Sequence, residues 1–256
     1  MLVEMRNPEL KYPRAIRAEK VRIVLLWLAE FRFSTLEILS KRLGLELSTS
    51  RSFFLDLIRE NVLDIFENPH TRGVRYVMIG AAGREILSAR YGVSNVRCKA
   101  GSLATYTSII HDLAIQELVL AKIGDFSEVI WDQNIAEHCG KRPDALVKYP
   151  KGYWLALEFE RVRKNKPRIY TEFQSHVEAI RKGLYAGIYY VFFDPKLKGL
   201  YKAHFDEVQW PTYVHDRKQA KFRLSDEREI LAGDDVIRKC FIFTDYQEYI
   251  EIRKAN

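Results

Sequence analysis

The segment ALVKYPKGYWLALEFE constrains this chain most, because it reads as two β-strands joined by a tight turn. Residues 142–148 and 153–161 are rich in strand-forming side chains, and Tyr149-Pro150-Lys151-Gly152 between them has turn chemistry. The segment therefore predicts a β-hairpin centred on Lys151, and the hairpin fixes which residues of the two strands face each other.

Carboxylates mark this predicted hairpin. Pairing centred on Lys151 puts Asp144 opposite Glu158, with Cβ atoms about 5 Å apart. Strand alternation puts Glu158 and Glu160 on one face and Leu155, Leu157 and Phe159 on the other, which we expect to be the core side. Three converging carboxylates repel one another unless a cation lies between them. The pattern favours a Mg²⁺ or Mn²⁺ site with Asp144, Glu158 and Glu160 as ligands, and solvated acids on an exposed strand are the alternative.

A helix is predicted upstream, over residues 105–123, with Glu117 inside its apolar stripe and His111 near its start. An acid on an inward face needs a partner, whereas a lone histidine of this kind is more often a structural hydrogen-bonder than a ligand. The segments that follow predict a strand over residues 128–135, the hairpin, a helix over 167–183 and a buried strand over 186–193.

The first hundred residues have a different pattern, typical of short helices followed by a hairpin. A helix over residues 14–31 precedes a helix-turn-helix in which Ser34 or Thr35 caps the first helix, Gly44 makes the turn and Ser48 or Thr49 caps the second. The second helix, over residues 49–60, is expected to present three residues to DNA, Ser50, Arg51 and Ser52. Strands over 62–66 and 74–79 flank a turn with Arg72, which completes a winged-helix pattern; a dimerisation module is the alternative.

Charge agrees with a nucleic-acid partner. The 256 residues contain 41 Lys plus Arg against 34 Asp plus Glu, a net charge of +7, of which residues 1–100 account for +6. Residues 91–104 read as a linker, so we expect a winged-helix domain over 1–95 and a second domain over 96–256. Three widely spaced cysteines suggest neither disulfides nor a zinc site, and no apolar run is long enough for a membrane span, so a cytoplasmic protein is expected.

The order of these elements, with Pro143-Asp144 and then Glu158-x-Glu160 on successive strands, is similar to the core of the PD-(D/E)xK nuclease fold. With the preceding winged helix, the motifs R-P-D-A and L-E-F-E-R-x-x-K resemble the replication-relaxation family, and within it the MOBC class of plasmid-mobilisation relaxases. The resemblance extends to about Phe193. It implies an α/β (α+β) fold, a winged helix followed by a restriction-endonuclease-like mixed sheet flanked by helices.

The resemblance also implies an activity: a metal-dependent single-strand nick at a plasmid transfer origin. Asp144 and Glu158 would bind the metal with help from the Phe159 carbonyl, and Glu160 would bind a second metal or orient water. The family's usual lysine is absent at position 160, so Lys164, or else Lys166, would steady the phosphate. Support from Glu117 and His111 is implied, as are DNA contacts by a basic run whose residues are Arg161, Arg163, Lys166 and Arg168.

The implied partners are double-stranded origin DNA, the nicked single strand, an accessory mobilisation protein and a coupling protein. No membrane partner is expected. Two other functions remain open: a DNA-binding replication initiator or regulator with an inactive nuclease-like domain, and a double-strand endonuclease of the restriction type. In the last sixty residues, aromatics between basic residues could stack unpaired bases, although such aromatics are more often packed in a core; they include Tyr201, Phe205, Trp210 and Tyr213.

Overall fold

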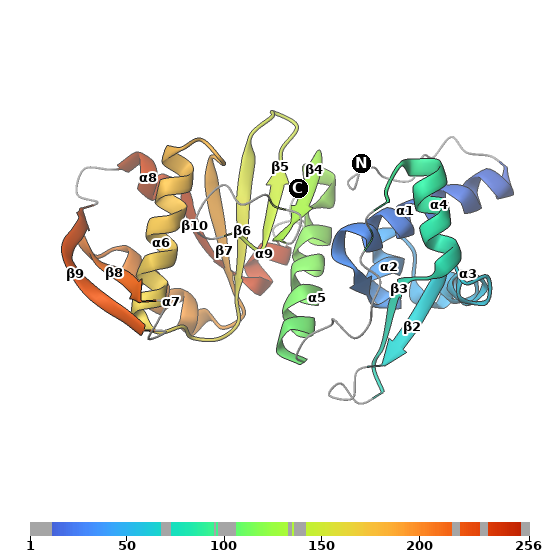
Figure 1. Cartoon of the computed structure of the whole chain (residues 1–256), viewed down its shortest axis with the longest axis horizontal. Coiled ribbons are helices and arrows are strands. Elements are labelled where there is room, and N and C mark those ends of the chain that lie inside the picture. The colour runs from blue at the N-terminus through green and yellow to red at the C-terminus, as the bar shows by residue number, and fades with distance from the viewer. Residues whose placement is uncertain are drawn as a thin grey trace. The chain divides into compact units, whose positions relative to one another are not determined.

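A computed structural model describes residues 12–67, 73–94, 96, 106–132, 135, 142–216, 221–230 and 235–251 of the chain. The chain divides into two compact units, residues 1–128 and residues 129–256 (Figure 1). Both helices and sheets occur, so the expected mixed α/β class is confirmed. Among the described helices, none is long and apolar enough to cross a membrane.

The first unit consists of helices and a small antiparallel sheet of strand order β1-β3-β2. In chain order its elements are α1 (Pro13–Phe31), β1 (Phe33–Ser34), α2 (Leu36–Arg42), α3 (Leu47–Arg59), β2 (Leu63–Glu67), β3 (Arg75–Ile79), α4 (Ala81–Tyr91), α5 (Tyr106–Ala121) and a 3-10 turn at Ile123–Asp125. Helix α4, which the sequence reading had left unassigned, ends at Gly92, a glycine in the left-handed conformation.

The pair α2–α3 forms largely as its sequence predicts. The Thr35 hydroxyl accepts a hydrogen bond from the backbone N–H of Ile38, and Gly44 adopts a φ of 67° in the turn that follows α2. The predicted cap of α3 was wrong: this helix starts at Leu47 after Glu46, and neither Ser48 nor Thr49 lies at its end. Because α3 begins at Leu47, each of its later residues lies further from the N-terminus of the helix than a start at Thr49 implies.

Helix α5 belongs to the first unit, although the sequence placed it with the second domain. The Gln116 side chain, which is fully buried, accepts hydrogen bonds from Trp27 Nε1 at 2.9 Å and Ser34 Oγ at 2.7 Å and donates one to the Phe33 carbonyl at 2.9 Å. These bonds join α5 to α1 and β1. The boundary between the two compact units falls after residue 128 of the chain, whereas composition predicted a boundary after residue 95.

The second unit is built on a five-stranded sheet of order β10-β7-β6-β5-β4, antiparallel between β5 and β6 and parallel from β6 through β7 to β10. Its elements are β4 (Glu128–Trp131), β5 (Ala145–Lys148), β6 (Trp154–Glu160), α6 (Lys166–Arg181), β7 (Gly187–Phe192), α7 (Pro195–Phe205), β8 (Gln209–Asp216), β9 (Lys221–Ile230), α8 (Asp235–Lys239), β10 (Phe241–Asp245) and α9 (Tyr246–Glu251). The ribbon β8–β9 forms a separate two-stranded sheet, which the sequence reading did not anticipate.

The predicted hairpin is confirmed together with its register. Ala145 pairs with Leu157 and Lys148 with Trp154, so the ladder is centred on Lys151. The turn closes with a hydrogen bond from Gly152 N–H to the Tyr149 carbonyl, and Gly152 has a φ of 92°, which a residue with a side chain adopts only at a cost. Continuing this register by one residue places Asp144 opposite Glu158.

Both faces of β6 are covered, so the alternative of solvated acids on an exposed strand is wrong. On the face of Glu158 and Glu160, helix α6 packs into an aromatic core in which Phe173 contacts Tyr190, Tyr201 and Trp210. On the other face, Phe159 contacts Tyr246 of α9. The acidic side chains therefore lie inside the protein, because β6 is a central strand between two packed layers.

Candidate functional site

Asp144 lies immediately before β5 and is half-buried. Its Oδ2 accepts a hydrogen bond from the backbone N–H of Phe159 at 2.8 Å, and its own carbonyl accepts one from Asp132 N–H at 3.0 Å. These contacts hold the carboxylate at the end of the hairpin beside β6. The placement follows from the register that the short turn imposes, so the sequence was sufficient to predict it.

Glu158 is 2% exposed, and its nearest basic group is a histidine that the sequence reading did not select. Nε2 of His176 lies 3.3 Å from Glu158 Oε1, and Nδ1 of His176 lies 2.6 Å from the Tyr185 hydroxyl. His176 is itself 1% exposed. A signal was present in the sequence: His176 falls on the apolar stripe of α6, three residues after Phe173 and seven after Ile169.

Glu160 is also 2% exposed and contacts a cation. Lys164 Nζ lies 2.5 Å from Glu160 Oε1 and 2.8 Å from Oε2 of Glu172, a second buried acid that the sequence reading missed. Arg168 Nε contacts the other oxygen of Glu172 at 3.1 Å. Burial by itself would lower the pKa of Lys164, but the neighbouring carboxylates outweigh it and raise this pKa well above its usual value, so Lys164 is charged at neutral pH.

Two tyrosines complete the surroundings of these acids. Tyr190 is fully buried beside them, and the Tyr201 hydroxyl lies 3.4 Å from Glu160 Oε2. Burial, followed by the nearby carboxylates, raises the pKa of both phenols well above the usual value. Both therefore keep their proton at neutral pH. Of the C-terminal aromatics that could stack bases or pack in a core, Tyr201, Phe205 and Trp210 are at most 2% exposed and form core, which is the alternative that the sequence favoured.

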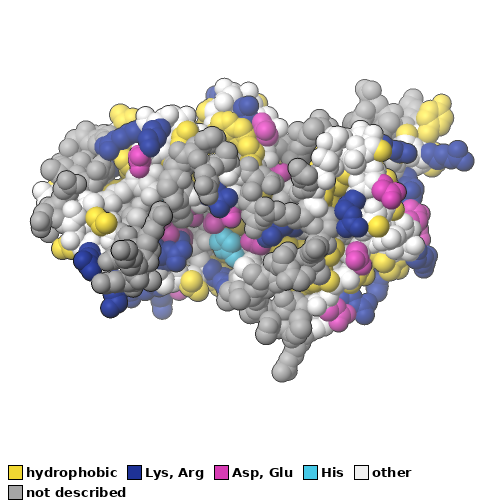
Figure 2. All heavy atoms as spheres, viewed as in Figure 1, with side chains coloured by type: hydrophobic (Ala, Val, Ile, Leu, Met, Phe, Trp, Pro, Cys, Tyr) yellow, Lys and Arg dark blue, Asp and Glu magenta, His cyan; other side chains and the backbone are white. Residues whose placement is uncertain are grey.

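The basic run, residues 161–168, is largely exposed. Arg163, Lys166 and Arg168 are exposed and Arg161 is half-buried. The run leads into the N-terminus of α6, where Asn165 caps the helix by accepting a hydrogen bond from Arg168 N–H at 3.0 Å. Lys166 lies 3.7 Å from a Glu207 carboxylate oxygen. On the face of the molecule that Figure 2 shows, Lys and Arg side chains are dispersed among Asp and Glu side chains.

His111 and Glu117 lie on α5 in the first unit, whereas Asp144, Glu158 and Glu160 lie in the second. Glu117 does not point into the core as predicted; its side chain is 38% exposed and lies 3.4 Å from Lys41 Nζ. The inward position belongs to the preceding residue, Gln116, since α5 packs against α1 and β1 through that face. The predicted buried face of α5 was therefore wrong by one residue: Gln116, not Glu117, lies in the core.

The three expected DNA-reading residues of α3 separate in the structure. Ser50 was wrongly assigned: it is 1% exposed, and its hydroxyl lies 2.7 Å from that of Ser40 and donates to the Glu46 carbonyl at 2.9 Å. It therefore joins α3 to α2. Arg51 and Ser52 are exposed near the start of α3, as predicted. Arg72, expected in the turn between β2 and β3, lies outside the described residues.

No three His, Cys, Asp or Glu side chains within the described residues are grouped so that they could hold a metal ion. Of the three predicted ligands, Glu160 is paired with the charged Lys164, Glu158 lies 3.3 Å from His176 Nε2, and Asp144 is half-buried at the end of the hairpin. Comparison with protein-family models, with curated proteins and with solved structures finds no match to this chain.

Proposed function

We propose that this chain is a DNA-binding enzyme that makes a metal-dependent single-strand nick, as a plasmid-mobilisation relaxase does. The observation that carries the proposal is the β5–β6 register, which, continued by one residue beyond Ala145, sets Asp144 opposite Glu158; Glu160 on the same strand contacts the charged Lys164. Opposed carboxylates beside a buried cation resemble the centre of PD-(D/E)xK nucleases, in which two acids and a basic group act on a phosphodiester. The order β4, β5, β6, α6, β7 of the second unit supports the same fold.

DNA binding is assigned to the first unit. The succession α2, α3, β2, β3 matches a winged helix, in which the second helix of the pair enters the major groove through its N-terminal part. Arg51 and Ser52 are exposed at that part of α3, where an arginine can read guanine or bind a phosphate. The excess positive charge of residues 1–100 would add affinity for any duplex.

Asp144 and Glu158 would hold the Mg²⁺ or Mn²⁺ ion. Such ions prefer oxygen ligands and are commonly bound by one or two carboxylates together with substrate phosphates, so this donor pair fits if the DNA completes the site. When bound, the ion supplies a lowered pKa for water and stabilisation of the leaving oxygen. Glu160 is assigned a different role, namely to orient Lys164, because the two side chains are in contact.

The basic residues would hold the strand that is cut. Lys164 remains protonated at neutral pH and can place its charge near the scissile phosphate, while Arg161 and Arg163 precede it on the same connection. Arg168 and Lys166 would contact the backbone further along, at the start of α6. An accessory mobilisation protein and a coupling protein are further partners on this proposal.

The test uses supercoiled plasmid carrying the mobilisation region, incubated with the full chain and Mg²⁺, Mn²⁺ or EDTA. Open circles that form with either metal and not with EDTA are expected from the wild type. Asp144→Asn should abolish them, because the amide removes the charge but keeps an acceptor for Phe159 N–H. Asp206→Asn, at an exposed acid paired with Lys202, is the matched control and should nick normally. Linear product without open circles would instead favour a double-strand endonuclease.

A second function is favoured by the burial of the acids. Glu158, Glu160 and Glu172 are at most 5% exposed, and each faces a basic side chain from β6–α6 or α6. If these contacts only stabilise the core of the second unit, that unit has no nuclease activity. The protein would then act as a DNA-binding replication initiator or regulator. This function predicts a gel shift that Arg51→Gln weakens, and intact supercoiled plasmid under every metal condition.

A further inference from the structure

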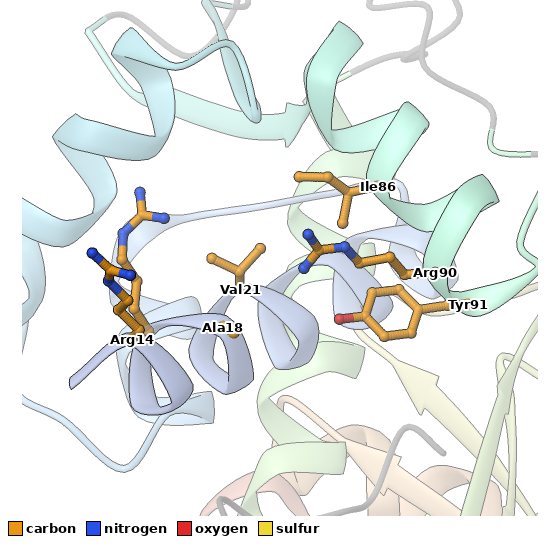
Figure 3. A pocket seen from close by; sticks show the side chains of 7 residues that line it. Arg14, Ala18, Val21, Ile86, Arg90 and Tyr91 are labelled. Atoms are coloured by element: carbon orange, nitrogen blue, oxygen red, sulfur yellow. The ribbon is translucent and has the colours of Figure 1, made fainter. Parts of the chain in front are cut away.

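A cavity in the first unit has a composition that neither DNA reading by α3 nor the acidic centre of the second unit explains. It has a volume of about 250 Å³ and lies between the first turns of α1 and the last turn of α4 (Figure 3). Its lining consists of Arg14, Arg17, Ala18, Val21, Ile86, Arg90 and Tyr91. Three arginines and no acid therefore line a space whose remaining walls are apolar or aromatic.

Helical spacing explains how these side chains come together. Arg14, Arg17 and Val21 recur at intervals of three and four along α1 and thus share one face, and Ile86 and Arg90 are four apart on α4. In Figure 3, Arg90 and Tyr91 extend from α4 toward α1, and Val21 extends from α1 toward α4. Arg14 and Arg90 therefore lie on opposite sides of an apolar surface that includes Val21.

The charges of this cavity are only partly neutralised. Arg17 donates to both oxygens of Glu60, each at 2.6 Å, so its charge is paired. Arg14 and Arg90 are exposed, and neither has a carboxylate partner within the described part of the chain. Arg90 offsets the negative end of α4, which accounts for a cation in its last turn but not for its extension toward Arg14 across the cavity.

We propose that this cavity is a binding site for a phosphate ester, held by Arg14 and Arg90. Guanidinium groups bind phosphate through paired hydrogen bonds, and Arg14 also lies at the N-terminus of the 19-residue helix α1, where backbone N–H groups favour an anion. The apolar surface and the Tyr91 ring would cover the sugar or base attached to that phosphate. Such a phosphate belongs either to a free nucleotide or to a DNA backbone, and the chemistry of recognition is the same.

The experiment measures two ligands with the full chain. Calorimetric titration with ADP tests a free nucleotide, and fluorescence anisotropy with a labelled duplex over a range of salt concentrations tests a DNA backbone. The variants are Arg14→Gln and Arg90→Gln. The matched control is Arg84→Gln, which removes an exposed arginine of α4 that does not line the cavity.

If the ligand is a nucleotide, each cavity variant should weaken ADP binding about tenfold, the value of one charged hydrogen bond, and the control should bind as the wild type does. If it is DNA, each cavity variant should reduce the slope of log K against log salt by about one, with no change in the control. Wild-type ADP binding without nicking or DNA binding would support the cavity while the proposed function fails. The cavity proposal is overturned if both cavity variants match Arg84→Gln in both titrations, or if the wild type binds neither ligand.

Discussion

Replacing Lys164 by methionine should destabilise the second unit by about 3 kcal/mol, because removal of one partner from a buried ion pair leaves an uncompensated charge. Lys164 Nζ is 2.5 Å from Glu160 and 2.8 Å from Glu172, and its side chain is 17% exposed. Glu172 would keep its contact with Arg168, whereas Glu160 would lose its closest cation, Lys164, and keep the Tyr201 hydroxyl at 3.4 Å. Because Arg168 still compensates Glu172, we expect the loss of stability to fall at the low end of the usual range of about 3–5 kcal/mol.

The assay is urea unfolding at pH 7 followed by circular dichroism. Lys182→Met is the control, since Lys182 forms the same i,i+4 contact with Glu178 but both side chains are more than half exposed, and such surface pairs contribute about 0–1 kcal/mol. Adding Glu160→Gln to Lys164→Met should recover most of the loss, because the buried charge is then gone. A Lys164→Met protein as stable as Lys182→Met, or a double variant without recovery, would refute this account of the buried pair.

Three further outcomes are expected from other contacts. Gln116→Ala should cost about 3 kcal/mol in urea unfolding, since it leaves the buried Trp27 N–H and the Phe33 carbonyl without their partner; a loss below 1 kcal/mol would contradict the docking of α5. Ser50→Ala should lower stability by about 1 kcal/mol yet leave the DNA sequence preference unchanged, as measured by competition binding. Folding raises the pKa of Lys164, so the stabilisation that this lysine contributes is complete below its ordinary pKa of 10.5 and is lost as the pH rises through its pKa in the folded protein. The difference in unfolding free energy between the wild type and Lys164→Met should therefore be constant near neutral pH and should decrease only in strong alkali.

Local signals in the sequence were enough for the hairpin and for the helix pair of the first unit. The turn Tyr149–Gly152 sets the register of β5 and β6 through residues close together in the chain, so Asp144 could be paired with Glu158 in advance. The Thr35 cap and the turn at Gly44 depend on neighbours a few residues away, and both were predicted correctly. Where the signal was weaker, at the start of α3, the predicted cap was wrong.

Which side of each element is buried was decided only by tertiary packing. The sequence marks Glu158 and Glu160 as polar, but α6 and the aromatic cluster around Phe173 cover their face of the sheet, and Lys164 and His176 become their partners only in the folded chain. Ser50 turns inward because α2 supplies Ser40, and α5 joins the first unit through Gln116. Burial depends on segments distant in the sequence, and periodicity along one element carries no information about which distant segment will cover it.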